Sequence, residues 1–274
     1  MLCKNNYFMI KLLLKNYLIE ELTYLLNYIK FTSYQLLGFA LAIPKLIKFK
    51  KYPDRFDLKE KFQFLHIQAK KSLDFINIKL TIIGKEKIPK EPVLFVINHS
   101  SMLDSFILLA SVDRPIGCLI ADEPIWKNMP IIKDWTSITK CIYINRTNNR
   151  EGIKSIIEAS KNIVSGHSMA VFPEGDLTWV KDPDALVSDF RNGALKIAYK
   201  AQCPIVPLVI KNSRDIYEGY QPIGKIFSHP VEVEFLDPIY DHINDSSLKS
   251  THLATNIKNK MIDKIKEYKN KYGD

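Results

Sequence analysis

The stretch "VLFVINHSSMLD", residues 93–104, holds the pattern from which the fold can be predicted. Its first five residues are continuously apolar, which is typical of a strand buried on both faces of a parallel sheet. Polar residues follow at once, and Ser100 or Ser101 is placed to cap a helix that begins there. A buried strand that leads directly into a helix is the repeating unit of α/β domains.

Similar apolar segments recur along the chain, and helical patterns lie between them. We expect strands at residues 77–83, 93–97, 141–144, 169–172, 204–210 and 231–235. We expect helices at residues 57–75, 153–164, 194–201 and 251–274. The last strand alternates as an edge or half-exposed strand does, and the last helix is rich in lysine and expected to be solvated. This order predicts an α/β fold, a single domain over residues 57–274 with a mainly parallel sheet flanked by helices.

An N-terminal helical membrane-associating segment is expected to precede this domain. Residues 1–56 carry nine Lys or Arg and three acids, which accounts for +6 of the net charge of +9. We expect two amphipathic, interfacial helices here, because the uncharged run at residues 31–44 is shorter than the roughly 20 residues of a membrane span. A helical hairpin packed on the protein's own core is the alternative.

The composition also limits the partners and the compartment. The surplus of positive charge lies on apolar helices, which favours an anionic membrane surface as partner and no nucleic acid. The four cysteines lack C-x-x-C spacing, which is typical of reduced thiols in a cytosolic protein. We therefore expect a peripheral or monotopic protein on the cytoplasmic face of the cell membrane.

His99 and Asp104 form the first candidate site, at the end of the strand 93–97. The two side chains can meet if His99 lies in the turn before the helix and Asp104 one turn inside it. A carboxylate bonded to one imidazole nitrogen fixes the tautomer and leaves the other nitrogen free to take a proton. The pair therefore predicts a general base with the carboxylate that orients it.

Glu174 and Gly175 form the second candidate, where the strand 169–172 ends in "FPEG". A turn built from Pro and Gly fixes the backbone and lets a ligand approach it closely. A glutamate held there can bond to substrate hydroxyls. A solvated loop carboxylate beside a plain turn glycine is the alternative.

Together the two sites resemble the glycerolipid acyltransferase family, typified by the 1-acylglycerol-3-phosphate acyltransferases. The resemblance rests first on Asn98-His99-x4-Asp104 followed by "FPEG". Further family blocks match in order: "GKEKIP" (84–89), "IYINR" (142–146), "FRNGALKIA" (190–198) and "CPIVPLVI" (203–210). The match covers roughly residues 57–240, and the ordered set is far more specific than any one motif.

This resemblance implies an O-acyltransferase of phospholipid synthesis, with 1-acylglycerol-3-phosphate as the default acceptor. It implies that His99 deprotonates the acceptor hydroxyl and that Asp104 orients His99. It assigns substrate-binding roles to Glu174, Gly175, Arg146, Arg191, Pro204 and Pro207, the prolines in the acyl site. The implied co-substrate is acyl-CoA, acyl-carrier protein or acyl phosphate, and no metal or prosthetic group is required.

The third block departs from the family pattern. It commonly continues Thr-Arg-Ser, whereas this chain has Asp176, Leu177 and Thr178, and Asp122 stands where a lysine is frequent. These changes predict weaker binding of a phosphorylated acceptor, unless Arg191 supplies the missing cation. Two alternatives therefore stay open: an acyltransferase for a non-phosphorylated lysolipid, and a non-catalytic lipid-binding protein on the same fold.

Overall fold

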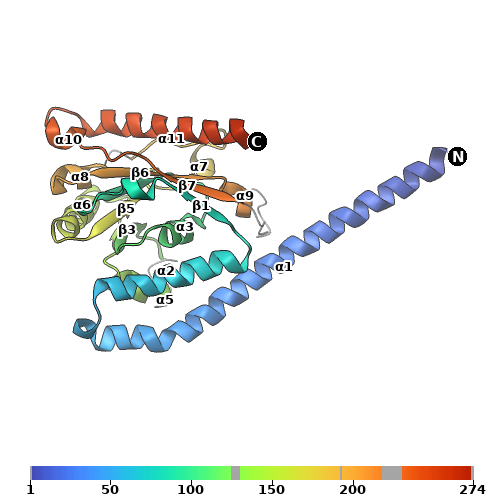
Figure 1. The fold of residues 1–274 in the computed structure, drawn as a ribbon, viewed down its shortest axis with the longest axis horizontal. Coiled ribbons are helices and arrows are strands. Elements are labelled where there is room, and N and C mark those ends of the chain that lie inside the picture. The colour runs from blue at the N-terminus through green and yellow to red at the C-terminus, as the bar shows by residue number, and fades with distance from the viewer. Residues whose placement is uncertain (1, 125–129, 192, 218–229, 273–274) are drawn as a thin grey trace.

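The computed structural model describes residues 2–124, 130–191, 193–217 and 230–272, and it is built around a seven-stranded sheet (Figure 1). The strands follow the order β1-β7-β6-β2-β5-β3-β4. Their bounds are β1 Leu80–Ile83, β2 Leu94–Ile97, β3 Ile116–Ala121, β4 Ile142–Ile144, β5 Ser168–Val171, β6 Ile205–Lys211 and β7 Val231–Phe235. The neighbouring pairs are parallel except β6–β7, so β1 and β7 run opposite to the other five strands. The predicted mainly parallel α/β sheet is confirmed.

Helices cover both faces of this sheet (Figure 1). Their bounds are α1 Leu2–Lys51, α2 Leu58–Phe75, α3 Asp104–Ser111, α5 Pro130–Ile138, α6 Asn149–Val164, α7 Thr178–Lys181, α8 Lys196–Ala201, α9 Arg214–Tyr217, α10 Asp241–Asn244 and α11 Ser250–Tyr272, with 3-10 turns η1 Pro53–Arg55 and η2 Lys85–Lys87. Apolar residues of α2 and α3 form one core cluster with the sheet, and those of α6, α8 and α11 form a second.

Three expectations about these elements need correction. The strand β3 was not expected. The strand β7 alternates in burial as predicted, but it lies between β1 and β6 and is not an edge strand. The helix α11 is not solvated all round, because Leu253, Ile257 and Met261 repeat every four residues and are buried in the second cluster.

The N-terminal segment forms one helix of 50 residues, α1, rather than two. Pro44 lies inside this helix and does not end it. Near its C-terminal end, Ala42, Leu46 and Phe49 are buried against Trp135 of α5, whereas the N-terminal part projects well beyond the domain (Figure 1). Among the described helices, none combines the length and the apolar character that crossing a membrane demands. The boundary at residue 56 between the N-terminal segment and the domain of residues 57–274 stays a prediction.

A buried charge cluster ties β6 to β7. The ammonium group of Lys211, with the residue only 3% exposed, donates to Glu232 at 2.7 Å and to Glu234 at 2.5 Å. Lys264 of α11 also approaches Glu234, at 3.8 Å. Because the two glutamates come from one face of β7, Lys211 separates two carboxylates that otherwise repel each other.

Replacing Lys211 with alanine is expected to lower the free energy of unfolding by about 3–5 kcal/mol, because it removes the buried cation that lies between two largely buried carboxylates. Lys211→Met keeps most of the packed volume, so it should recover part of this loss but not the charge pairing. Chemical denaturation of the two variants measures the effect. A decrease below about 1 kcal/mol in Lys211→Ala, on the scale of an exposed ion pair, would contradict it.

Candidate active site

The site lies at the carboxyl ends of β2 and β5, which are neighbours in the sheet. This is where parallel α/β sheets usually place ligands and catalytic groups. Asn98 directly follows β2 and bonds with its side chain to both backbone groups of Ile210, at 2.9 Å and 2.8 Å. The amide thereby extends the ladder with β6 by one residue and fixes the turn that carries His99.

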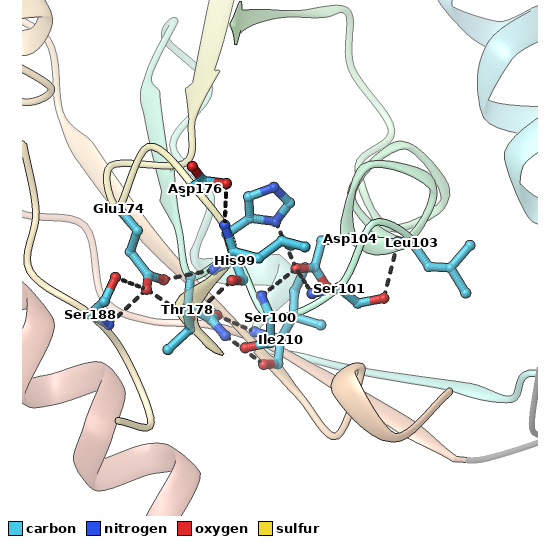
Figure 2. A network of polar contacts seen from close by, with 12 residues as sticks. His99, Ser100, Ser101, Leu103, Asp104, Glu174, Asp176, Thr178, Ser188 and Ile210 are labelled. Carbon is cyan, nitrogen blue, oxygen red and sulfur yellow. Dashed lines mark hydrogen bonds and ion pairs between the residues drawn. The ribbon is translucent and has the colours of Figure 1, made fainter. Parts of the chain in front are cut away.

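His99 and Asp104 meet as the sequence predicts (Figure 2). Nδ1 of His99 lies 3.0 Å from Oδ2 of Asp104, and the same oxygen accepts the backbone N–H groups of Ser100 and Ser101 at 2.7 Å and 2.8 Å. Because a carboxylate oxygen accepts at Nδ1, the imidazole carries its proton on Nδ1 and Nε2 is left as the base. The imidazole also stacks on Phe172, with ring centroids 4.3 Å apart.

The helix begins differently from the prediction. Asp104 is the first residue of α3 rather than one turn inside it, and the hydroxyl of Ser101 accepts the N–H of Leu103 at 3.1 Å. The carboxylate of Asp104 instead accepts the N–H groups of Ser100 and Ser101, which lie in the turn before the helix. Asp104 is fully buried, whereas the side chain of His99 is 18% exposed, so only the imidazole is open to a substrate.

Glu174 has a different role from the predicted one. It is fully buried, and its Oε1 accepts the backbone N–H of His99 at 2.8 Å (Figure 2). Its Oε2 accepts the N–H and the hydroxyl of Ser188 at 2.7 Å and 2.6 Å, and lies 2.7 Å from Oγ1 of Thr178. The expectation that Glu174 bonds to acceptor hydroxyls is therefore wrong, because protein donors occupy both oxygens. Glu174 holds the turn of His99 instead.

Thr178 and Ser188 are the functional residues that the sequence analysis missed. The backbone N–H of Thr178 donates to the carbonyl of His99 at 2.7 Å, and Oγ1 lies 2.9 Å from that oxygen. The position of Thr178, four residues after Glu174 in the third family block, is a sequence signal that could have identified it as part of the site. Ser188 lies in "DALVSDF", where no motif marks it.

Gly175 makes room for the side chain of Arg191. Its φ angle of +78° is in the left-handed region that favours glycine. A Cβ atom placed there would overlap Nε of Arg191 and lie 3.1 Å from its Cζ. The N–H of Arg191 donates to the carbonyl of Pro173 at 2.8 Å, which fixes the arginine's backbone beside the turn.

Arg146 reaches the same turn from the end of β4. Its Nη1 lies 3.9 Å from Oδ2 of Asp176 and 4.0 Å from Oε1 of Glu123. Burial lowers the pKa of Arg146, the nearby charge of Arg191 lowers it further, and the two carboxylates oppose this. The structure thus brings together both arginines that the resemblance assigned to the substrate.

Pro204 directly precedes β6 and Pro207 lies within it, so neither belongs to the turns that carry His99 and Glu174. Pro207 is a buried position within β6 opposite Val96, and the carbonyl of Pro204 accepts the N–H of Leu94 at the start of β2. In the register of β2 and β6, Pro204 is level with Val93, six residues before His99, which at about 3.3 Å per residue is roughly 20 Å along the strand direction. Their predicted role in the acyl site is not supported, because both belong to the core of the sheet.

Comparison with known proteins agrees with this geometry. Residues 79–211 match the family model described as "Acyltransferase". The chain is 29% identical over 248 residues to a Mycoplasma pneumoniae protein named "Probable 1-acyl-sn-glycerol-3-phosphate acyltransferase", covering 81% of this chain and 89% of that one. It is 25% identical over 194 residues to "1-acyl-sn-glycerol-3-phosphate acyltransferase" of Saccharomyces cerevisiae, covering 70% of this chain and 61% of that one.

A solved structure shares the fold. The "1-acyl-sn-glycerophosphate (LPA) acyltransferase, PlsC, from Thermotoga maritima" superimposes with a TM-score of 0.75 at 18% identity, covering 91% of this chain and 98% of that one. The matched family segment contains His99, Asp104, Arg146, Glu174 and Arg191. The chain therefore carries an acyltransferase-family domain over residues 79–211, as its motifs predict.

Proposed function

We propose that this acyltransferase esterifies the free hydroxyl of 1-acylglycerol-3-phosphate (lysophosphatidic acid) in phospholipid synthesis. The observation that carries the proposal is the His99–Asp104 pair, with Nε2 of His99 free beside a turn that two arginines approach. A base and a cationic site together suit an acceptor with both a hydroxyl and a phosphate. The names of the relatives support the same acceptor.

The reaction that fits this site is direct acyl transfer. Nε2 of His99 takes the proton of the acceptor hydroxyl as its oxygen attacks the acyl carbonyl carbon. A new ester C–O bond forms, the C–S bond of a thioester donor breaks, and the imidazolium returns the proton to the departing thiolate. The carboxylate of Asp104 stabilises the imidazolium in between. Acyl-CoA, acyl-carrier protein and acyl phosphate all supply a suitable leaving group.

An acceptor panel tests the proposal. Purified protein is given a labelled acyl donor and, in turn, lysophosphatidic acid, lysophosphatidylcholine and monoacylglycerol. We expect acyl transfer to lysophosphatidic acid and a clear preference for it over the other two. Transfer to monoacylglycerol alone would favour a non-phosphorylated acceptor, and donor binding without transfer to any lipid would favour a lipid-binding protein.

The helix α1 supports a membrane location for this reaction. Leu18 and Leu22 are 64% and 57% exposed on the projecting part of the helix, and lysines are clustered near its C-terminal end. A helix that carries both exposed leucines and a group of lysines suits the interface of an anionic membrane. We propose that α1 holds the enzyme peripherally on the cytoplasmic face, where a lysolipid acceptor resides.

The double substitution Leu18→Glu/Leu22→Glu is expected to weaken binding to anionic vesicles at least ~10-fold. The reason is that two large apolar side chains no longer enter the interface and two negative charges are repelled by it. Vesicle co-sedimentation measures the change, and raising the salt should weaken wild-type binding without abolishing it. Removal of all of α1 is a poorer test because Ala42, Leu46 and Phe49 are packed on the domain.

The matched control is Ile153→Glu/Val164→Glu on α6, where the two apolar side chains are 56% and 73% exposed. This variant adds the same two charges to the catalytic domain and should bind vesicles nearly as wild type does. Equal loss of binding in both variants would mean that total charge, and not α1, decides membrane binding.

A further inference from the structure

Two cysteines, Cys118 and Cys141, lie beside each other on the neighbouring parallel strands β3 and β4. The register pairs Leu119 with Ile142, so the residues one position earlier are level with each other. The backbone N–H of Cys118 donates to Sγ of Cys141 at 3.2 Å. Neighbouring strands are about 4.7–4.9 Å apart, and the Cα atoms of a disulfide are about 4.4–6.8 Å apart. A bond between the two sulfurs therefore requires only local movement.

The surroundings of this pair favour a thiolate on Cys141. A hydrogen bond from the thiol of Cys118 lowers the pKa of Cys141 to about 7 in spite of burial, and Oγ1 of Thr139 lies 3.5 Å from the same sulfur. The same bond between the thiols, together with burial, raises the pKa of Cys118. Cys141 thus has the character of a nucleophile, and Cys118 keeps its proton close to it.

The position of β4 in the sheet suits a change in the pair. The strand has three residues and stands last in the strand order, beside β3. A short strand at the end of a sheet can shift toward its neighbour without moving the central strands. The side chains of Cys118 and Cys141 are both partly exposed, so a small oxidant can reach the sulfurs.

Cys203 provides a contrast within the same chain. This residue is 4% exposed, and burial raises the pKa of its thiol to about 12. A buried thiol that stays protonated reacts slowly with oxidants, because the thiolate is the reactive form. The three cysteines are therefore expected to differ sharply in reactivity.

We propose that Cys118 and Cys141 form a peroxide-sensitive dithiol site, in which a hydroperoxide oxidises Cys141 and Cys118 then closes a reversible disulfide between β3 and β4. The inference is independent of the acyl-transfer chemistry at His99. It assigns a modification site to two residues that lie outside the catalytic pair and its anchoring turn.

The chemistry takes two steps. The thiolate of Cys141 attacks the terminal oxygen of the hydroperoxide, so that an S–O bond forms, the O–O bond breaks and the alcohol leaves after taking a proton from water. The sulfur of Cys118 then attacks the sulfur of Cys141. The S–S bond forms, the S–O bond breaks, and the departing hydroxide takes the proton of Cys118 to become water. The two sulfurs lose two electrons in total, which the hydroperoxide gains.

Peptide mapping of the full-length protein tests the site. Every sample carries Cys3→Ser, so that the N-terminal thiol does not consume oxidant, and is treated with a few equivalents of hydrogen peroxide before the free thiols are alkylated. We expect the peptide cross-linked between Cys118 and Cys141 to increase at least ~10-fold over untreated protein, and dithiothreitol to reverse it. Cys203 should stay reduced.

Cys118→Ser identifies the order of the two steps. Without the resolving thiol, the sulfenic acid of Cys141 should accumulate, and dimedone should trap at least ~10-fold more of it than in the parent protein. Cys118→Ala removes the thiol without adding a hydroxyl and should behave in the same way. Cys203→Ser is the matched control and should form the cross-link as the parent protein does.

Three results would overturn the inference. If Cys118 and Cys141 stay reduced in peroxide, the sulfur of Cys141 serves only to accept the N–H of Cys118. Cross-links that join two chains instead of β3 and β4 would exclude an internal disulfide. Equal trapping by dimedone in the parent protein and in both Cys118 variants would show that Cys118 does not resolve the oxidised Cys141.

Discussion

Replacing His99 with alanine is expected to lower the rate of acyl transfer at least ~100-fold without unfolding the protein. General-base catalysis commonly supplies this factor, and His99 has a partly exposed imidazole whose Nδ1, and not its Nε2, contacts Asp104. The side chain of His99 is partly exposed, and within the described part of the chain the substitution removes one hydrogen bond of its imidazole, that to Asp104. The rate is measured with lysophosphatidic acid and a thioester donor, and thermal unfolding is recorded in parallel. Activity within a few-fold of wild type would contradict the mechanism.

Asp104→Asn should have nearly the same effect on the rate. The amide oxygen can still accept the N–H groups of Ser100 and Ser101, so the turn can persist. The imidazolium that forms during transfer loses its negative partner, which raises the barrier. Asp263→Asn, on the exposed side of α11, is the matched control and should leave the rate unchanged. Near-normal activity in Asp104→Asn would show that the ion pair is not used in catalysis.

Glu174→Ala is expected to have the largest effect on stability in the site, lowering the free energy of unfolding by about 3–5 kcal/mol. The change leaves the buried N–H groups of His99 and Ser188 and the hydroxyl of Thr178 without their acceptor. The catalytic rate should also fall at least ~10-fold, because the turn of His99 loses its anchor. Denaturant unfolding and steady-state kinetics measure the two effects on the same preparation.

Glu174→Gln and Glu158→Ala are its controls. The glutamine keeps one acceptor oxygen and should have an intermediate effect, whereas Glu158 is exposed on α6 and should matter little. The two possible roles of Glu174 give opposite patterns. If Glu174 bound the acceptor directly, Glu174→Ala would raise KM and leave the free energy of unfolding unchanged. That result would contradict the buried role described above.

The sequence predicts those parts of the fold that depend on local pattern. The continuous apolar runs of β2 and β5 are recognisable because both strands are buried on both faces. The catalytic pair is recognisable because His99 and Asp104 are close in sequence and share one turn. Their meeting depends only on where a strand ends and a helix begins.

The parts that escaped prediction depend on contacts between distant segments. The buried role of Glu174 cannot be predicted locally, because its donors include the N–H of His99, 75 residues before it, and two groups of Ser188, 14 residues after it. The open backbone of Gly175 was assigned to the acceptor because nothing local shows that Arg191 folds across it. For α1, the sequence predicts two helices, whereas the segment forms one continuous helix whose C-terminal end packs on α5.

The most direct test of the whole account is to identify the product formed from labelled acyl donor and lysophosphatidic acid. Wild type and His99→Ala are incubated under the same conditions, and the labelled lipids are separated, identified and quantified by mass spectrometry. We expect the wild type to form phosphatidic acid, with the label esterified to the acceptor's free hydroxyl, and His99→Ala to form at most about one hundredth as much. Label recovered only as free fatty acid, or equal amounts of phosphatidic acid from both proteins, would contradict the account.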